Sequence, residues 1–133
     1  MISNIAKKYE AYLYVLFRVF VGLLFFMHGA QKLFGWFTDK GAQEWMSLMG
    51  AAGAIEGVGG LLILLGLFTR LAALISALEM AVAFFMAHFK PPWVPLQTGG
   101  ELAMLYFAAF AVVIAYGNGK WSVEQLVFGK ETF

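Results

Sequence analysis

Residues 12–34 read YLYVLFRVFVGLLFFMHGAQKLF, and within them Arg18, His28 and Lys32 are the only residues of the Asp, Glu, Lys, Arg and His types. The length matches the roughly 20 apolar residues that a helix needs to cross the hydrocarbon core of a bilayer. It exceeds the hydrophobic region of a secretory signal peptide, which spans about 7–15 residues and does not carry an internal arginine. We therefore expect a retained membrane helix.

Three further apolar stretches follow, at residues 51–68, 71–89 and 100–117. The whole chain is 62% hydrophobic and 13% charged, with a mean hydropathy of +0.78. A soluble domain is typically about 45–50% apolar and about 25% charged. Because lipid offers no partners for backbone polar groups, the spans should be helical. The sequence predicts an all-α integral membrane protein, with residues 1–133 forming one domain built as a four-transmembrane-helix bundle in a lipid bilayer.

The segments between the apolar stretches also predict local structure. Residues 35–50 mix aromatic and charged side chains, which favours a short helix on the membrane surface. Thr69 and Arg70 are expected to form the turn between the second and third spans. The proline-rich residues 90–95 should end the third span.

Four spans place both termini on one side of the membrane. Positive charges are more frequent on that side. It carries five of them (Lys7, Lys8, Arg70, Lys120 and Lys130), and the other side carries three (Lys32, Lys40 and Lys90). Cytoplasmic segments are enriched in lysine and arginine. We therefore predict a multi-pass protein of the cell (inner) membrane with both termini in the cytoplasm.

Charge and cysteine content exclude several functions. The net charge is +1 and no basic run occurs, which argues against nucleic acid as a partner. The chain has no cysteine, so thiol chemistry, iron–sulfur clusters and thiolate metal sites are excluded. A redox role would need a bound cofactor or a partner protein, either soluble or in the membrane. Assembly into a homo-oligomer is left open.

Two opposite charges are predicted to meet inside the membrane. With a rise of about 1.5 Å per residue, Arg18 lies about 9 Å from the cytoplasmic end of its span, and Glu79 about 12 Å from the same end of its own. Charged groups at such depth are costly and need partners. The shared depth predicts a buried Arg18–Glu79 ion pair that stabilises the bundle geometry.

A second group of polar residues gathers towards the other face of the membrane. Arg18, His28 and Lys32 share one stripe of the first helix, together with Gly22 and Phe25. Glu56 in the second span lies at the depth of His28. The predicted ligand-binding pocket near the outer leaflet contains His28, Gln31, Lys32, Glu56 and Glu101.

Three chemistries fit this pocket. A quinone head group could accept hydrogen bonds from His28 and Lys32 while a glutamate exchanges protons. A metal could instead bind to His28, Glu56, Glu101 and His88, which are ligand types that suit zinc, iron or manganese. A proton or ion path through the acidic groups is the third possibility. A non-catalytic scaffold or assembly factor, in which the charges serve packing alone, is the alternative to all three.

The order of these motifs resembles the DoxX family. The resemblance rests on Arg18…Phe25-Phe26-Met27-His28-Gly29-Ala30-Gln31-Lys32-Leu33, on Glu56-Gly57-Val58-Gly59-Gly60-Leu61…Leu65-Gly66-Leu67-Phe68-Thr69-Arg70, on Glu79-Met80…His88-Phe89 and on Gly99-Gly100-Glu101…Tyr106. It implies a small four-helix membrane protein. It also implies a link to quinone chemistry, since some family members are subunits of thiosulfate:quinone or quinol oxidoreductases. By this resemblance the chain could be an oxidoreductase subunit, and because it has no cysteine and no soluble domain it would need a partner protein for catalysis.

Overall fold

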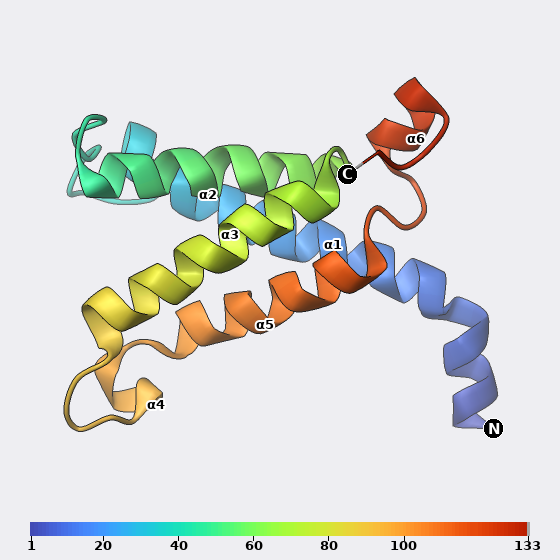
Figure 1. Cartoon of the computed structure of the whole chain (residues 1–133), viewed down its shortest axis with the longest axis horizontal. Coiled ribbons are helices and arrows are strands. Elements are labelled where there is room, and N and C mark those ends of the chain that lie inside the picture. Colours follow the sequence, from blue (N-terminus) through green and yellow to red (C-terminus); the bar gives the residue numbers. More distant parts are fainter. Residues whose placement is uncertain (133) are drawn as a thin grey trace.

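The computed structural model describes residues 1–132, and every regular element in that range is helical (Figure 1). Four longer helices are joined by short connections, one of which contains the small helix α4, and a second small helix, α6, follows the last of them. Their bounds are α1 Ile2–Phe34, α2 Leu48–Leu65, α3 Thr69–Ala83 with its continuation η1 Phe84–His88, α4 Pro95–Thr98, α5 Glu101–Tyr116 and α6 Val123–Phe128. The prediction of an all-α protein is confirmed.

Three helices are long and apolar enough to cross a membrane: Ile2–Phe34, Leu48–Leu65 and Thr69–His88. They correspond to the first three predicted spans, with α1 beginning ten residues earlier than residue 12. The fourth apolar helix, α5, has 16 residues and falls short of that length. The protein is therefore a multi-pass membrane protein by the composition of its helices.

Two expectations about the connections are wrong. Residues 35–47 form turns and bends without a helix, and the Trp45 indole donates a hydrogen bond to the Leu33 carbonyl across this loop. The turn between α2 and α3 lies at residues 66–68, where Gly66 has a φ of 72° that suits glycine. Thr69 is already the first residue of α3.

The four long helices form two pairs. α1 packs mainly on α2, and α3 packs mainly on α5. α3 then runs obliquely away from α2, starting at the turn that connects them (Figure 1). Because the two pairs diverge in this direction, they are close at one end of the molecule and apart at the other.

Glycines let α1 and α2 approach until their backbones touch. A Cβ atom built on Gly22 would overlap the backbone of Leu64, and one on Gly29 would overlap the backbone of Gly57. A Cβ on Gly60 would overlap the backbone of Phe26. Small residues allow this kind of close helix contact in membranes, where packing rather than the hydrophobic effect drives association.

An aromatic cluster joins the two pairs at the centre of the molecule. Phe25 of α1 is buried against two rings of α5, Phe110 at 4.7 Å and Tyr106 at 5.1 Å between ring centroids. Small residues of α3, such as Ala73 and Ala77, complete this core. Each such ring pair adds about 0.5–1.5 kcal/mol to the effect of burial.

Arg18 holds the chain that follows α5. The guanidinium is buried and donates hydrogen bonds to the carbonyls of Asn118, of Lys120 at 3.1 Å and of Trp121 at 3.2 Å. The Asn118 amide in turn donates to the buried carboxylate of Glu124 at 2.5 Å. The positive charge in α1 is thus linked to a negative charge in α6 through one asparagine.

The predicted Arg18–Glu79 ion pair is wrong. Among residues 1–132 the ion pairs are Lys32–Glu56 and Arg70–Glu131, and neither involves Arg18 or Glu79. Arg18 lies beside Gly66 at the turn between α2 and α3, and backbone carbonyls of the loop after α5 accept hydrogen bonds from its guanidinium instead. Glu79 lines a cavity elsewhere in the bundle.

The glycine contact predicts an asymmetric response to a single methyl group. Gly29→Ala should separate α1 from α2 and destabilise the protein by about 1–3 kcal/mol, as overpacking typically does. Gly57→Ala is the matched control, because its Cβ would meet the nearest atom, on Leu33, at an ordinary 3.6 Å. Thermal unfolding in detergent would measure both. Equal melting temperatures for the two variants would contradict the contact.

Candidate functional site

A cavity of about 470 Å³ lies between the two helix pairs. Its volume falls within the range of about 300–1,000 Å³ that is usual for ligand pockets. Residues of α1, α2, α3, η1 and α5 line it. The polar side chains among them are His28, Lys32, Glu56, Glu79, His88 and Tyr106.

Lys32 and Glu56 form an ion pair on the cavity wall. The Lys32 ammonium lies 2.5 Å from Oε1 of Glu56, and the glutamate is only 2% exposed. The close contact of α1 with α2 brings these two residues together, since Gly29 and Gly57 lie beside them on the same two helices. A carboxylate at this depth needs such a partner because desolvation is costly.

Two carboxylate oxygens in the cavity have no hydrogen-bond partner. Oε2 of Glu56 and Oε2 of Glu79 are both buried and both unpaired. Buried polar atoms are normally satisfied, so each unpaired atom in a native structure requires an explanation. Lys32 supplies one positive charge for the two glutamates, which leaves the cavity rich in hydrogen-bond acceptors.

The His28 imidazole packs edge-on against Tyr106. The two ring centroids are 5.8 Å apart and the planes are nearly perpendicular, at 86°. Tyr106 itself stacks on Phe110 and is largely buried. This contact brings a side chain of α5 into the wall that α1 and α2 form, so the cavity has polar groups on both helix pairs.

The π-helical turn η1 accounts for the position of His88. On an ideal helix His88 would lie opposite Glu79, since nine steps of about 100° each amount to two and a half turns. One extra residue in a turn rotates the following residues by about 100°. Both side chains accordingly line the same cavity, and Nδ1 of His88 lies 2.8 Å from the Thr98 carbonyl.

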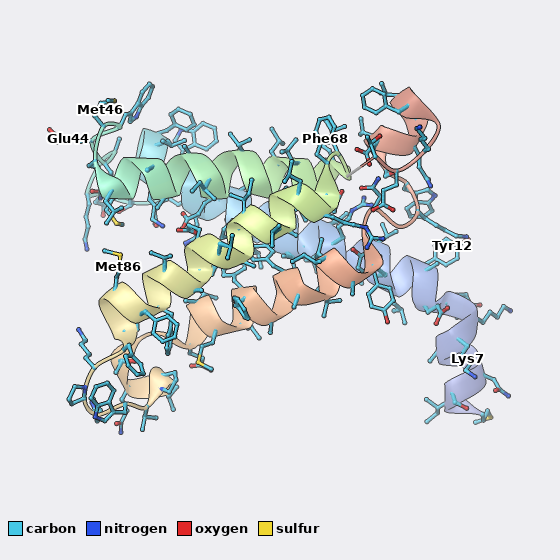
Figure 2. The ribbon with its side chains drawn as sticks, viewed as in Figure 1. Lys7, Tyr12, Glu44, Met46, Phe68 and Met86 are labelled. Atoms are coloured by element: carbon cyan, nitrogen blue, oxygen red, sulfur yellow. The ribbon has the colours of Figure 1, made fainter. Side chains whose placement is uncertain are left out.

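The cavity has an apolar rim. Leu48 and Met49 line it from the beginning of α2, and Val82 and Met86 line it from the end of α3 and from η1. Figure 2 shows the Met86 side chain rising from η1 in the direction of α2. The rim would therefore suit an apolar portion of a ligand, while the inner wall would suit a polar one.

The structure brings together only part of the predicted pocket. His28, Lys32 and Glu56 line the cavity as a group, whereas Gln31 and Glu101 are absent from its lining. Glu101 is exposed at the beginning of α5. Across residues 1–132 no three side chains of the His, Cys, Asp or Glu types lie close enough to hold a metal ion. The geometry therefore does not support the metal site proposed from His28, Glu56, Glu101 and His88.

Two lining residues had no functional role assigned from the sequence. Glu79 was assigned to an ion pair with Arg18, and Tyr106 entered only through the family resemblance. The sequence does contain a signal for Glu79, because this acidic residue lies among mostly apolar residues and no basic residue lies one helical turn away. A single tyrosine in an apolar helix is a weaker signal.

Removing one partner of the Lys32–Glu56 pair should show how much the pair contributes to stability. Lys32→Met leaves the Glu56 carboxylate without its cation and should cost about 3 kcal/mol, the lower end for buried pairs, because Lys32 is partly exposed. The double change Lys32→Met with Glu56→Met should recover most of this loss. Unfolding in detergent micelles would measure both, with the exposed Lys40→Met as control. A double variant less stable than the single one would refute the pairing.

The chain is similar in sequence to known proteins. The sequence model of the DoxX family matches residues 13–89. An uncharacterized protein of Haemophilus influenzae is 35% identical over 133 residues, which is 96% of this chain and 99% of that protein. A Bacillus subtilis protein named "Putative oxidoreductase CatD" is 34% identical over 85 residues, covering 59% of this chain and 62% of that protein. No solved structure matches the chain. By the family match and the full-length relative, the chain belongs to the DoxX family.

Proposed function

We propose that this protein is a small membrane subunit linked to redox chemistry and that it binds a quinone in the cavity between its two helix pairs. The name of the Bacillus subtilis relative, "Putative oxidoreductase CatD", supports the redox link. The observation that carries the proposal is the pair of unpartnered, buried carboxylate oxygens on Glu56 and Glu79 beside the Lys32 ammonium.

The polar wall suits both oxidation states of such a ligand. A quinone presents carbonyl oxygens, which accept hydrogen bonds, and Lys32 has donors beyond the one directed at Glu56. A quinol presents hydroxyl groups, which donate, and the free oxygens of Glu56 and Glu79 accept. A site in which a quinone is reduced or a quinol is oxidised must bind both forms.

The apolar rim suits the isoprenoid tail. With the head group between Lys32 and Glu79, a tail would leave past Met49 and Met86 into the bilayer. The chain has no cysteine, and electrons would be exchanged with a cofactor of another protein. We therefore propose a soluble or membrane redox partner, and we treat the protein as one part of an oxidoreductase.

Quinone retention tests this function. Protein purified in mild detergent would be extracted and its quinone content measured by mass spectrometry, and short-chain ubiquinone and menaquinone would then be added back. Glu79→Gln and Lys32→Met should each weaken binding about tenfold, which corresponds to about 1.4 kcal/mol. Glu101→Gln is the matched control, since it removes the same charge outside the cavity and should bind like the wild type.

Two results would contradict the proposal. One is a wild-type protein that neither carries nor binds a quinone. The other is a Glu101→Gln variant that loses binding as strongly as Glu79→Gln. Either result would favour a scaffold or assembly role, in which the buried charges serve only packing.

We also propose that α5 is a fourth membrane span, with both termini in the cytoplasm. The support is that α5 is apolar, packs along α3 and is flanked by residues that extend the apolar stretch to 100–117. The excess of lysine and arginine at the end with both termini supports the orientation. Alkaline phosphatase fused after residue 92 should be active in the periplasm, and the same reporter fused after residue 133 should be inactive. Two active fusions would argue for three spans.

A further inference from the structure

Aromatic and basic side chains lie along the N-terminal part of α1, where Tyr12 contacts the loop between α5 and α6. Lys8 lies one helical turn before Tyr12, on the same face of α1. Nζ of Lys8 lies 5.4 Å from the ring centroid of Tyr9, and Nζ of Lys120 lies 4.6 Å from that of Tyr12. The Tyr12 ring also contacts Trp121, with 5.5 Å between centroids. Figure 2 labels Tyr12 at this point of α1, outside the packed part of the bundle. We call these five residues the basic–aromatic cluster.

The two ammonium groups of this cluster have no anionic partner among residues 1–132. The ion pairs in that range involve neither Lys8 nor Lys120. The acidic groups near the end of the chain are already engaged: Glu124 is buried and accepts from Asn118, and Glu131 accepts from Arg70. Glu10 lies within the same part of α1 but forms no ion pair with either lysine. The two ammonium groups of the cluster can therefore bind an anion from outside the chain.

The aromatic members of the cluster indicate that this outside group belongs to the membrane surface. Tyr9, Tyr12 and Trp121 are 46%, 44% and 72% exposed. Exposed tyrosine and tryptophan side chains concentrate at the level of lipid head groups, where an amphipathic ring contacts both apolar and polar surroundings. α1 has 33 residues against the roughly 20 that cross the hydrocarbon, so its first part extends to that level.

We propose that the basic–aromatic cluster binds the phosphate of an anionic phospholipid such as phosphatidylglycerol. The ammonium groups of Lys8 and Lys120 supply charge and hydrogen bonds to the phosphate, and the three rings contact the glycerol and the upper acyl chains. A zwitterionic lipid is disfavoured, because its own cationic head group is repelled by the two lysines. The site is separate from the cavity and does not depend on the quinone proposal.

Native mass spectrometry of delipidated protein in detergent tests this site. Phosphatidylglycerol and phosphatidylcholine would be added in equal amounts, and the bound lipid counted for each. The wild type should prefer phosphatidylglycerol, by about fivefold for each lysine in contact with the phosphate. Lys8→Gln with Lys120→Gln should reduce this preference to near one. The control, Lys40→Gln with Lys90→Gln, removes the same charge from two other exposed lysines and should leave the preference unchanged.

A rescue variant separates charge from folding. Lys8→Arg with Lys120→Arg keeps both cations and should restore the preference, while unfolding temperatures in lipid-free detergent should agree across all variants. The proposal is overturned if the Gln variant retains phosphatidylglycerol like the wild type. It is also overturned if the control loses the lipid equally, or if phosphatidylcholine binds the wild type as well as phosphatidylglycerol does.

Discussion

The backbone contact between α1 and α2 is the constraint on which the rest of the molecule depends. It exists because Gly22, Gly29 and Gly60 leave no side chain between the two helices. At that separation Lys32 and Glu56 meet directly, so a buried carboxylate gains a cation. The same contact turns the remaining faces of the two helices towards α3 and α5, which pack on the aromatic cluster around Phe25.

Buried charged side chains have partners at two places in the bundle. At one end of the bundle, the Arg18 guanidinium donates hydrogen bonds to backbone carbonyls, and Asn118 links it to the Glu124 carboxylate. At the other end, Lys32 pairs with Glu56. Glu79 lines the same cavity as Lys32 and Glu56 but has no ion-pair partner among the described residues, and one of its oxygens is buried and unpaired. An unsatisfied acceptor of this kind costs free energy, and a cavity that concentrates such acceptors is where a ligand would bring the most stabilisation.

The cavity depends on two departures from regular packing. The first is the divergence of the two helix pairs, which begins at the turn containing Gly66 (Figure 1). The second is the π-helical turn at Phe84–His88, which rotates the end of the third span and brings His88 to the cavity. π-turns within α-helices are frequent at functional sites. Both features make room beside polar groups at the cost of tighter packing, and both support a binding role for this region.

The sequence by itself determined the helical class, three of the spans, the polar stripe of α1 and the meeting of His28, Lys32 and Glu56. These features follow from the spacing of residues along single helices, because the spacing fixes which residues share a face and how far along the helix each one lies. The tertiary structure alone decided which partner each charge has. Arg18 binds the chain after α5 rather than Glu79, because the rotation of α3 and the path of the loop at 117–122 are set by contacts between distant segments. The exclusion of Gln31 and Glu101 from the cavity, and the entry of His88, likewise depend on helix rotation and on a π-turn that residue periodicity does not contain.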